Sequence, residues 1–184
     1  KIIFASSAAV YGDCEHVPIS EDSPLIPQSP YAVSKIVGEE LLRMSNIETC
    51  SLRFFNVYGP GQSSEGGYAA VIPAFKKAIS LGKECTIFGD GTQVRDFIHV
   101  NDLVQIISLC LEAIDLPQEM NVASGEGTSL LSLIETLNEL NPSMLPPVFS
   151  EERAGDIHTS VADISRLLST LPLTELVTLQ EGLS

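Results

Sequence analysis

The chain has 184 residues, of which 44% are hydrophobic and 18% charged, and ten basic against 24 acidic residues give a formal charge of -14. This composition favours a folded globular protein over a disordered one. The negative charge argues against binding to nucleic acid or to an anionic membrane surface, and no apolar run reaches the roughly 20 residues that span a bilayer.

The apolar patterning predicts strands that alternate with helices. A short buried strand at 1–6 is followed by a polar loop and by a helix that Ser29 caps, that Pro30 opens and that ends near residue 44. The further predicted elements are a strand at 49–55, a Gly/Ser-rich loop at 56–68, a helix at 71–81, strands at 85–88 and 94–100, a helix from the cap Asn101 to 113, a strand at 120–123, a helix from the cap Thr128 to 140, and a last short helix capped by Asp163.

This alternation is typical of an α/β fold with a doubly wound parallel sheet. Such sheets bind ligands beyond the carboxyl ends of their strands. We therefore expect the chemistry at Ser6 and Ser7 and from Asn56 onwards, where the first two predicted strands end. The apolar residues of the helix at 30–44 include a stripe that fits either the core or a dimer contact; it consists of Val33, Val37 and Leu41.

Tyr31 and Lys35 are four residues apart on the first helix and share one face. A nearby ammonium group favours the phenolate of a tyrosine, whose ordinary pKa is about 10, and a drop of about three units needs roughly 4 kcal/mol. Because Ser7 can hydrogen-bond the same substrate oxygen, the three residues predict a proton-transfer site for an alcohol or ketone. The alternative is a tyrosine packed under a lysine stem.

Five motifs occur in a fixed order: SSAAVYG at 6–12, YAVSK at 31–35, RFFNVYGP at 53–60, FGDGTQVRDF at 88–97 and RAGD at 153–156. With them the chain resembles the extended short-chain dehydrogenase/reductase superfamily, and within it the NAD-dependent nucleotide-sugar epimerases and dehydratases. The resemblance implies the C-terminal part of a Rossmann-type sheet at 1–69 and 94–114. It also implies a smaller mixed α/β domain that binds the nucleotide sugar, at 70–93 and 115–184.

The resemblance further implies a role for each matching residue. Tyr31 matches the catalytic acid/base, Lys35 the residue that lowers its pKa and holds the nicotinamide ribose, and Ser7 the residue that orients the sugar hydroxyl. The other matches are Ser6 and Phe55 beside the cofactor NAD, Asn56, Arg95 and Arg153 on the nucleotide diphosphate, and Asp156 on the nucleotide ribose.

Arginine suits a diphosphate because it makes bidentate, charge-assisted contacts. Two structural alternatives stay open: an ion pair of Arg95 with Asp96 or another acid, and a loop salt bridge between Arg153 and Asp156. The four cysteines and three histidines show no metal-ligand spacing. The cysteine usage fits a reducing, cytoplasmic compartment.

The resemblance also bears on the reaction. Family members that dehydrate the sugar carry an Asp-Glu pair directly after the matching serine, where this chain has Ala8 and Ala9. We therefore expect 4-epimerisation of a UDP-hexose through a 4-keto intermediate. Ser160 stands where a bulky tyrosine restricts related pockets, which favours UDP-GlcNAc/UDP-GalNAc, with or without UDP-Glc/UDP-Gal. The alternatives are a dehydratase, a decarboxylase, a reductase or a non-catalytic binding module.

A dinucleotide fold needs a Gly-rich turn near its start, and the sequence before Ser6 contains none. We expect at least three further strand–helix units upstream, roughly 100 residues at about 30 per unit, and one more helix after the C-terminus. By itself this segment is expected to be inactive and to bind NAD weakly or not at all, and the choice between NAD and NADP stays open. The resemblance implies a homodimer for the full-length protein.

Overall fold

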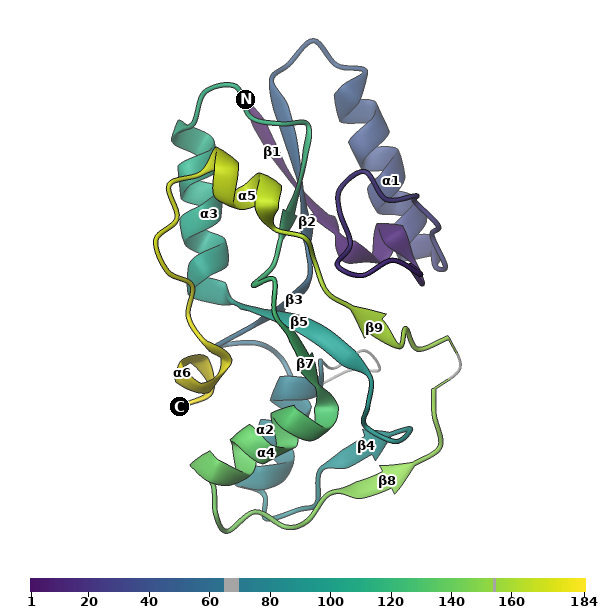
Figure 1. The fold of residues 1–184 in the computed structure, drawn as a ribbon, viewed down its shortest axis with the longest axis vertical. Coiled ribbons are helices and arrows are strands. Elements are labelled where there is room, and N and C mark those ends of the chain that lie inside the picture. Colours follow the sequence, from purple (N-terminus) through teal and green to yellow (C-terminus); the bar gives the residue numbers. More distant parts are fainter. Residues whose placement is uncertain (65–69, 154) are drawn as a thin grey trace.

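The computed structural model describes residues 1–64, 70–153 and 155–184 (Figure 1). The end of the predicted loop at 56–68 and Ala154 of the RAGD motif lie outside the described residues. The elements are β1 (Ile2–Ser7), the 3-10 helix η1 (Ala8–Tyr11), α1 (Pro30–Arg43), β2 (Thr49–Phe54), β3 (Asn56–Tyr58), α2 (Val71–Ser80), β4 (Thr86–Phe88), β5 (Val94–His99), α3 (Val100–Glu112), β6 (Glu119–Val122), β7 (Gly127–Ser129), α4 (Leu130–Leu140), β8 (Val148–Ser150), β9 (Thr159–Ser160), α5 (Ser165–Thr170) and α6 (Leu179–Leu183).

The first sheet is parallel, in the order β1-β2-β6, and lies between α1 and α3 (Figure 1). Successive side chains of a strand point to opposite faces. Cys50 and Leu52 of β2 accordingly pack with Ile106 and Cys110 of α3, whereas the next residue, Arg53, lies on the α1 face with its charged end bonded to Glu39. The predicted α/β fold with a parallel sheet is confirmed.

The second half of the chain is organised around β5. This strand pairs in parallel with β3 and β9 and antiparallel with β7, while β4 pairs in parallel with β8. An apolar core joins α2, α4 and α6 to this sheet. β6, at 119–122, pairs with β2 of the first sheet, and the division of the chain into two domains stays a prediction.

The turn predicted at Gly89-Asp90-Gly91 is present between β4 and β5. Both glycines have positive φ angles, of 79° and 82°, which only glycine adopts without strain. The Asp90 carboxylate accepts hydrogen bonds from the backbone N–H and the hydroxyl of Thr92. The turn separates the two strands, which pair with different neighbours.

The bounds of α1 agree with the prediction, and the Ser29 hydroxyl accepts the N–H of Ala32 at 3.1 Å. Two predicted caps are wrong by one or two positions. α3 is capped by His99, whose Nδ1 accepts from the N–H of Asn101 at 3.3 Å. α4 is capped by Ser129, the last residue of β7, whose hydroxyl accepts the N–H of Ser132 at 3.0 Å.

A third predicted cap, Asp163, is also wrong by one position: the N-cap of α5 is Ile164, although the Asp163 carboxylate accepts the N–H of Ser165. α5 is not the last helix, because α6 follows it. None of the helices in the described part of the chain has the length and hydropathy needed to span a bilayer.

The apolar stripe of α1 faces outward. Val33, Val37 and Leu41 are 47%, 50% and 65% exposed. Of the two alternatives for the stripe, the core of this chain is therefore excluded, and a dimer contact stays a prediction. The buried face of the helix instead contains Ala32 and the acidic residue Glu39.

Two buried tyrosines give the fold a testable response to alkaline pH. Burial raises the pKa of Tyr11 to about 12, although Arg53 beside it acts in the opposite direction. Burial likewise raises the pKa of Tyr58 to about 12. The pKa of each tyrosine is higher in the folded state than the unfolded value of 10.0. The stability that each neutral phenol contributes is therefore fully present below pH 10 and is lost as the pH rises towards about 12.

We therefore expect the free energy of unfolding to fall by up to about 3 kcal/mol for Tyr11 over this interval, because two pKa units correspond to about 2.7 kcal/mol. Chemical denaturation at a series of pH values, followed with phenolate absorbance, measures this loss. In the Tyr11→Phe variant, the part of this fall in the free energy of unfolding that Tyr11 causes should be absent. Titration of both tyrosines at their ordinary pKa with the fold intact would contradict the assignment.

Candidate active site

A cavity of about 300 Å³ lies at the carboxyl ends of β1 and β2. Ser7 ends β1, Phe55 and Asn56 follow β2, and Ser160 is the register partner of Arg95 between β9 and β5. The fold thus brings together six predicted site residues from distant parts of the sequence; the cavity is lined by Ser7, Phe55, Asn56, Arg95, Asp156 and Ser160, with Ala8, Ala9, Phe54, Gly155 and Ile157. We call it the first cavity.

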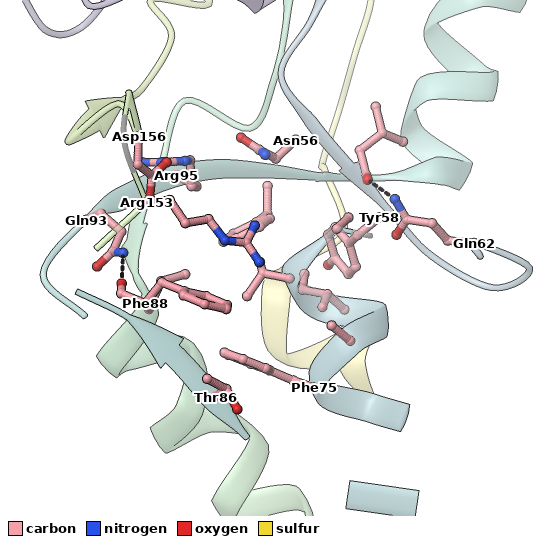
Figure 2. A pocket seen from close by; sticks show the side chains of 17 residues that line it. Asn56, Tyr58, Gln62, Phe75, Thr86, Phe88, Gln93, Arg95, Arg153 and Asp156 are labelled. Carbon is pink, nitrogen blue, oxygen red and sulfur yellow. Dashed lines mark hydrogen bonds and ion pairs between the residues drawn. The ribbon is translucent and has the colours of Figure 1, made fainter. Parts of the chain in front are cut away.

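A second cavity has a volume of about 210 Å³, and Figure 2 shows the side chains that line it. The two share Asn56, Arg95 and Asp156 in their linings, and the second adds Arg153. Asn56, Arg95 and Asp156 therefore lie where the two cavities meet, and Arg153 lies in the wall of the second.

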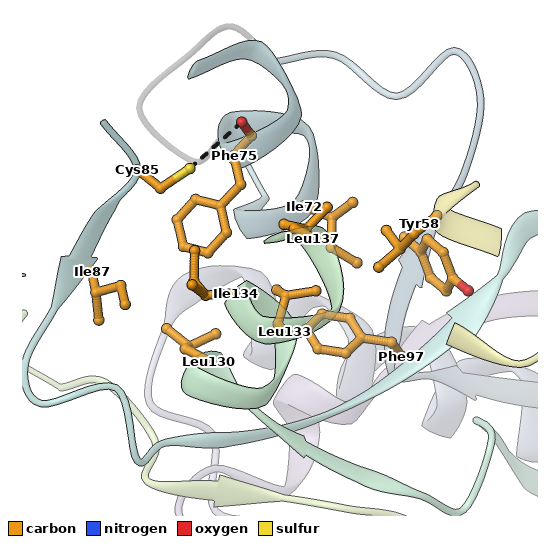
Figure 3. Packing of buried hydrophobic residues seen from close by; sticks show 11 residues of the cluster. Tyr58, Ile72, Phe75, Cys85, Ile87, Phe97, Leu130, Leu133, Ile134 and Leu137 are labelled. Carbon is orange, nitrogen blue, oxygen red and sulfur yellow. Dashed lines mark hydrogen bonds between the residues drawn. The ribbon is translucent and has the colours of Figure 1, made fainter. Parts of the chain in front are cut away.

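The floor of the second cavity is apolar. Phe75, Phe97 and Leu130 line it and also belong to the core between α2, α4 and β5 (Figure 3). Phe88 at the end of β4 adds an aromatic ring to the wall. An apolar chamber beside a cationic junction is suited to a ligand with one flat, uncharged end and one anionic group.

Arg95 is held in place at the junction. Its Nη2 lies 2.6 Å from Oδ1 of Asp156, and its Nη1 donates to the carbonyl of Val94 at 2.9 Å. The predicted alternative of an ion pair is therefore present, with Asp156 as the partner and not Asp96. Asp96 is buried, where it accepts bonds from the N–H and the hydroxyl of Ser124 and from two further backbone N–H groups, and burial raises the pKa of its carboxyl group.

Arg153 stacks on an aromatic ring. Its guanidinium carbon lies 3.9 Å from the centroid of the Phe88 ring, a cation–π contact. The Asp156 carboxylate pairs with Arg95, and its backbone N–H donates to the carbonyl of Arg153 at 3.1 Å. The predicted salt bridge between Arg153 and Asp156 is thus replaced by these three contacts.

Tyr31 and Lys35 share one face of α1, as predicted. The Lys35 Nζ lies 5.3 Å from the centroid of the Tyr31 ring and donates to the carbonyl of Ala5 at 2.8 Å. Tyr31 is 55% exposed, so the ring is not packed away under the lysine stem. These two residues lie outside the linings of the first and second cavities.

The two serines at the end of β1 have different surroundings. The Ser7 Oγ accepts the N–H of Ala9 at 3.2 Å and caps η1, which leaves its own O–H to donate to a ligand in the first cavity. The Ser6 hydroxyl is buried and donates to Oε1 of Glu39. The predicted place of Ser6 beside a cofactor stays a prediction.

The residues present suit the dinucleotide that the sequence motifs imply. Lys35 has three N–H donors, of which one is used by the Ala5 carbonyl, so two can serve ribose hydroxyls. Tyr31 is accessible beside it, and Phe55 offers an apolar contact at the wall of the first cavity.

Some lining residues were missed in the sequence. Gln93 is 7% exposed, lines the second cavity, and its Nε2 donates to the carbonyl of Phe88 at 2.6 Å. It lies inside the motif at 88–97, so its position in that motif was the available signal. Two buried residues behind the site that line neither cavity, Glu39 and Arg53, were also missed, although Glu39 follows Lys35 by one helical turn on the same face.

Comparison with known proteins identifies the relatives of the chain. The NAD dependent epimerase/dehydratase family matches residues 1–123. UDP-glucose 4-epimerase of Azospirillum brasilense is 34% identical over 93% of this chain and 55% of its own length. The family name covers more than one reaction.

Two solved structures superpose closely. UDP-N-acetylglucosamine 4-epimerase of Methanobrevibacter ruminantium, in complex with UDP-N-acetylmuramic acid, is 37% identical with a TM-score of 0.93 over 98% of this chain and 59% of its own. UDP-glucose 4-epimerase of Thermotoga maritima, with UDP-glucose, is 34% identical with a TM-score of 0.92 over 98% and 60%.

The chain thus spans between half and two thirds of the length of these relatives. Both the sequence match and the superposition place its α/β fold with the Rossmann-like epimerases, and the cofactor of the matched family is NAD. The chain belongs to the NAD-dependent epimerase/dehydratase family.

Proposed function

We propose that the full-length protein is an NAD-dependent 4-epimerase of a UDP-hexose. The observation that carries the proposal is the wall of the first cavity, where Ser7 is followed by Ala8 and Ala9. Elimination of water needs an acid and a base beside the sugar, and two methyl groups supply neither. Proton transfer by Tyr31 without elimination is the chemistry that these side chains support.

In the proposed reaction, Tyr31 accepts the proton of the sugar 4-hydroxyl and later returns a proton to the same oxygen. The Lys35 ammonium lies beside the Tyr31 ring, and Ser7 donates a hydrogen bond to the reacting oxygen. Hydride chemistry at the sugar carbon is supplied by NAD when it is bound; Lys35, Tyr31, Phe55 and Ser6 are the residues that would hold it.

The substrate is held through its nucleotide. Arg95 and Asn56 lie where the two cavities meet and Arg153 lies in the wall of the second, so a diphosphate there gains charge-assisted bonds. Asp156 would contact the nucleotide ribose, and the apolar second cavity would take the base. Because these contacts involve only the nucleotide, the 4-keto sugar is left free to turn over in the first cavity between the two proton transfers.

The test is an assay of the full-length protein with UDP-glucose and with UDP-N-acetylglucosamine, followed by NMR and mass spectrometry of the products. We expect a product of unchanged mass with inverted configuration at C4. Loss of water, loss of carbon dioxide or consumption of reduced cofactor would instead identify a dehydratase, a decarboxylase or a reductase. Binding without turnover would identify a binding module.

Ser160 provides a test of substrate choice. It lines the first cavity beside Arg95, and a bulky residue there should exclude an acetamido group. We expect Ser160→Tyr to lower kcat/KM for UDP-N-acetylglucosamine by about 10- to 200-fold relative to UDP-glucose, the range that pocket size typically gives. Ser160→Ala, which keeps the space, is the control. Equal effects of Ser160→Tyr on both substrates would contradict this role.

A further inference from the structure

A buried acidic residue links α1 to the strand that ends in Ser7. Glu39 lies two helical turns after Tyr31 and one turn after Lys35, so the three share a face of α1. Its carboxylate accepts the hydroxyl of Ser6, and both residues are 2% exposed. Lys35 donates to the carbonyl of Ala5. Two consecutive residues of β1, directly before Ser7, are therefore bonded to the Tyr31 face of the helix.

Arg53 of β2 holds the carboxylate from the other side. Its Nη2 lies 2.7 Å from Oε2 of Glu39, and its Nε donates to Oε1 at 3.0 Å, a bidentate pair. Its Nη1 donates to the Tyr11 hydroxyl at 3.0 Å and to the carbonyl of Glu21 at 2.9 Å. The Tyr11 hydroxyl in turn donates to Oδ1 of Asn121 at 2.6 Å.

This network is not explained by stability alone. A buried ion pair loses so much hydration that well-packed apolar residues of similar size usually stabilise a fold as well or better. What the network provides is a defined geometry, because both oxygens of Glu39 have fixed partners on two strands.

We propose that Glu39, held by Arg53, is a positioning residue for proton transfer. It acts through Ser6, and it fixes the helix that carries Tyr31 and Lys35 relative to the strand end that carries Ser7. The inference rests on the proposed function, since it assumes the roles of Tyr31 and Ser7 given above.

The alternation of side chains along β1 links the position of α1 directly to the position of Ser7. Ser6 faces α1 while its neighbour Ser7 lines the first cavity. A shift of α1 along β1 therefore changes the separation of Tyr31 from Ser7 without changing the cavity walls that come from β3, β5 and β9. A misplacement of about 1 Å in a reacting group lowers rates by up to about 100-fold.

The test uses Ser6→Ala, because removal of Glu39 leaves Arg53 unpaired and threatens folding. We expect kcat of the NAD-saturated full-length enzyme to fall by about 10-fold or more, while KM for the UDP-hexose stays within about twofold since Asn56, Arg95 and Arg153 are untouched. Ser6→Thr keeps the hydroxyl and should recover most of the lost kcat.

Tyr11→Phe is the matched control. It also removes one buried hydroxyl from the network, but on the far side of Arg53 from α1. We expect it to lower the melting temperature as much as Ser6→Ala does and to leave kcat near the wild-type value. Equal losses of kcat in the two variants, or wild-type kcat in Ser6→Ala, would overturn the inference.

A second readout separates this inference from the proposed function. If the wild-type enzyme epimerises no UDP-hexose, the proposed function fails, and amide hydrogen exchange of α1 still decides whether Ser6 positions the helix. Faster exchange in the first turns of α1 in Ser6→Ala than in Tyr11→Phe supports the link. Equal exchange in the two variants overturns it.

Discussion

Replacement of Tyr31 by phenylalanine should lower kcat for 4-epimerisation by about 10²- to 10⁴-fold, the usual contribution of a positioned acid/base. The substitution removes only the hydroxyl and keeps the ring beside the Lys35 ammonium. Tyr31 is 55% exposed at the first turn of α1, so stability should change by no more than about 0.5 kcal/mol. Affinity for the UDP-hexose should stay within about twofold, because the nucleotide contacts come from other elements.

Steady-state kinetics and isothermal titration of the full-length protein measure the two quantities separately. The Tyr11→Phe variant loses a tyrosine hydroxyl away from the reacting groups and should keep turnover near the wild-type value. Unchanged turnover in Tyr31→Phe would refute the catalytic role. A parallel loss of nucleotide-sugar affinity would instead assign Tyr31 to binding.

Local signals explain why parts of the fold were predictable. Ser29 and Pro30 define the start of α1 without reference to the rest of the chain. β3, β7, β8 and β9 are only two or three residues long and exist through pairing with distant strands, so their sequences carry little signal of their own. The cap of α4 was misplaced by one residue for this reason, since β7 extends through Thr128 to Ser129 and the helix begins directly after it.

In the candidate site, too, contacts between residues that are distant in the sequence could not be predicted. The motif at 88–97 indicated Arg95, but its acidic partner is Asp156, 61 residues away. The adjacent Asp96 points to the opposite face of β5, where it bonds Ser124, Gly125 and Ala162. Glu39 carries no local signal of burial in the sequence, because Val33 and Val37 are the apolar residues that recur along its helix. Only the packing of α1 on β1 shows that the apolar stripe faces outward and the carboxylate inward.

The buried pair of Arg53 and Glu39 should give the largest stability effect in the molecule. Arg53→Ala leaves the Glu39 carboxylate buried beside Ser6 with no cation. Loss of one partner of a buried pair costs about 3–5 kcal/mol, a large share of the 5–15 kcal/mol by which proteins of this kind are stable. We expect the melting temperature to fall on the order of 10 °C, measured by calorimetry or circular dichroism.

The double variant Arg53→Met/Glu39→Leu separates charge burial from geometry. Removing both charges also removes the cost of dehydrating them, so most of the lost stability should return. The hydroxyl of Ser6 then has no carboxylate to hold it, and α1 is no longer bonded to β1 at this point. We therefore expect a folded enzyme whose kcat stays well below that of the wild type. Recovery of kcat together with stability would show that packing alone places Tyr31, whereas stability without kcat would show that the pair is retained for alignment.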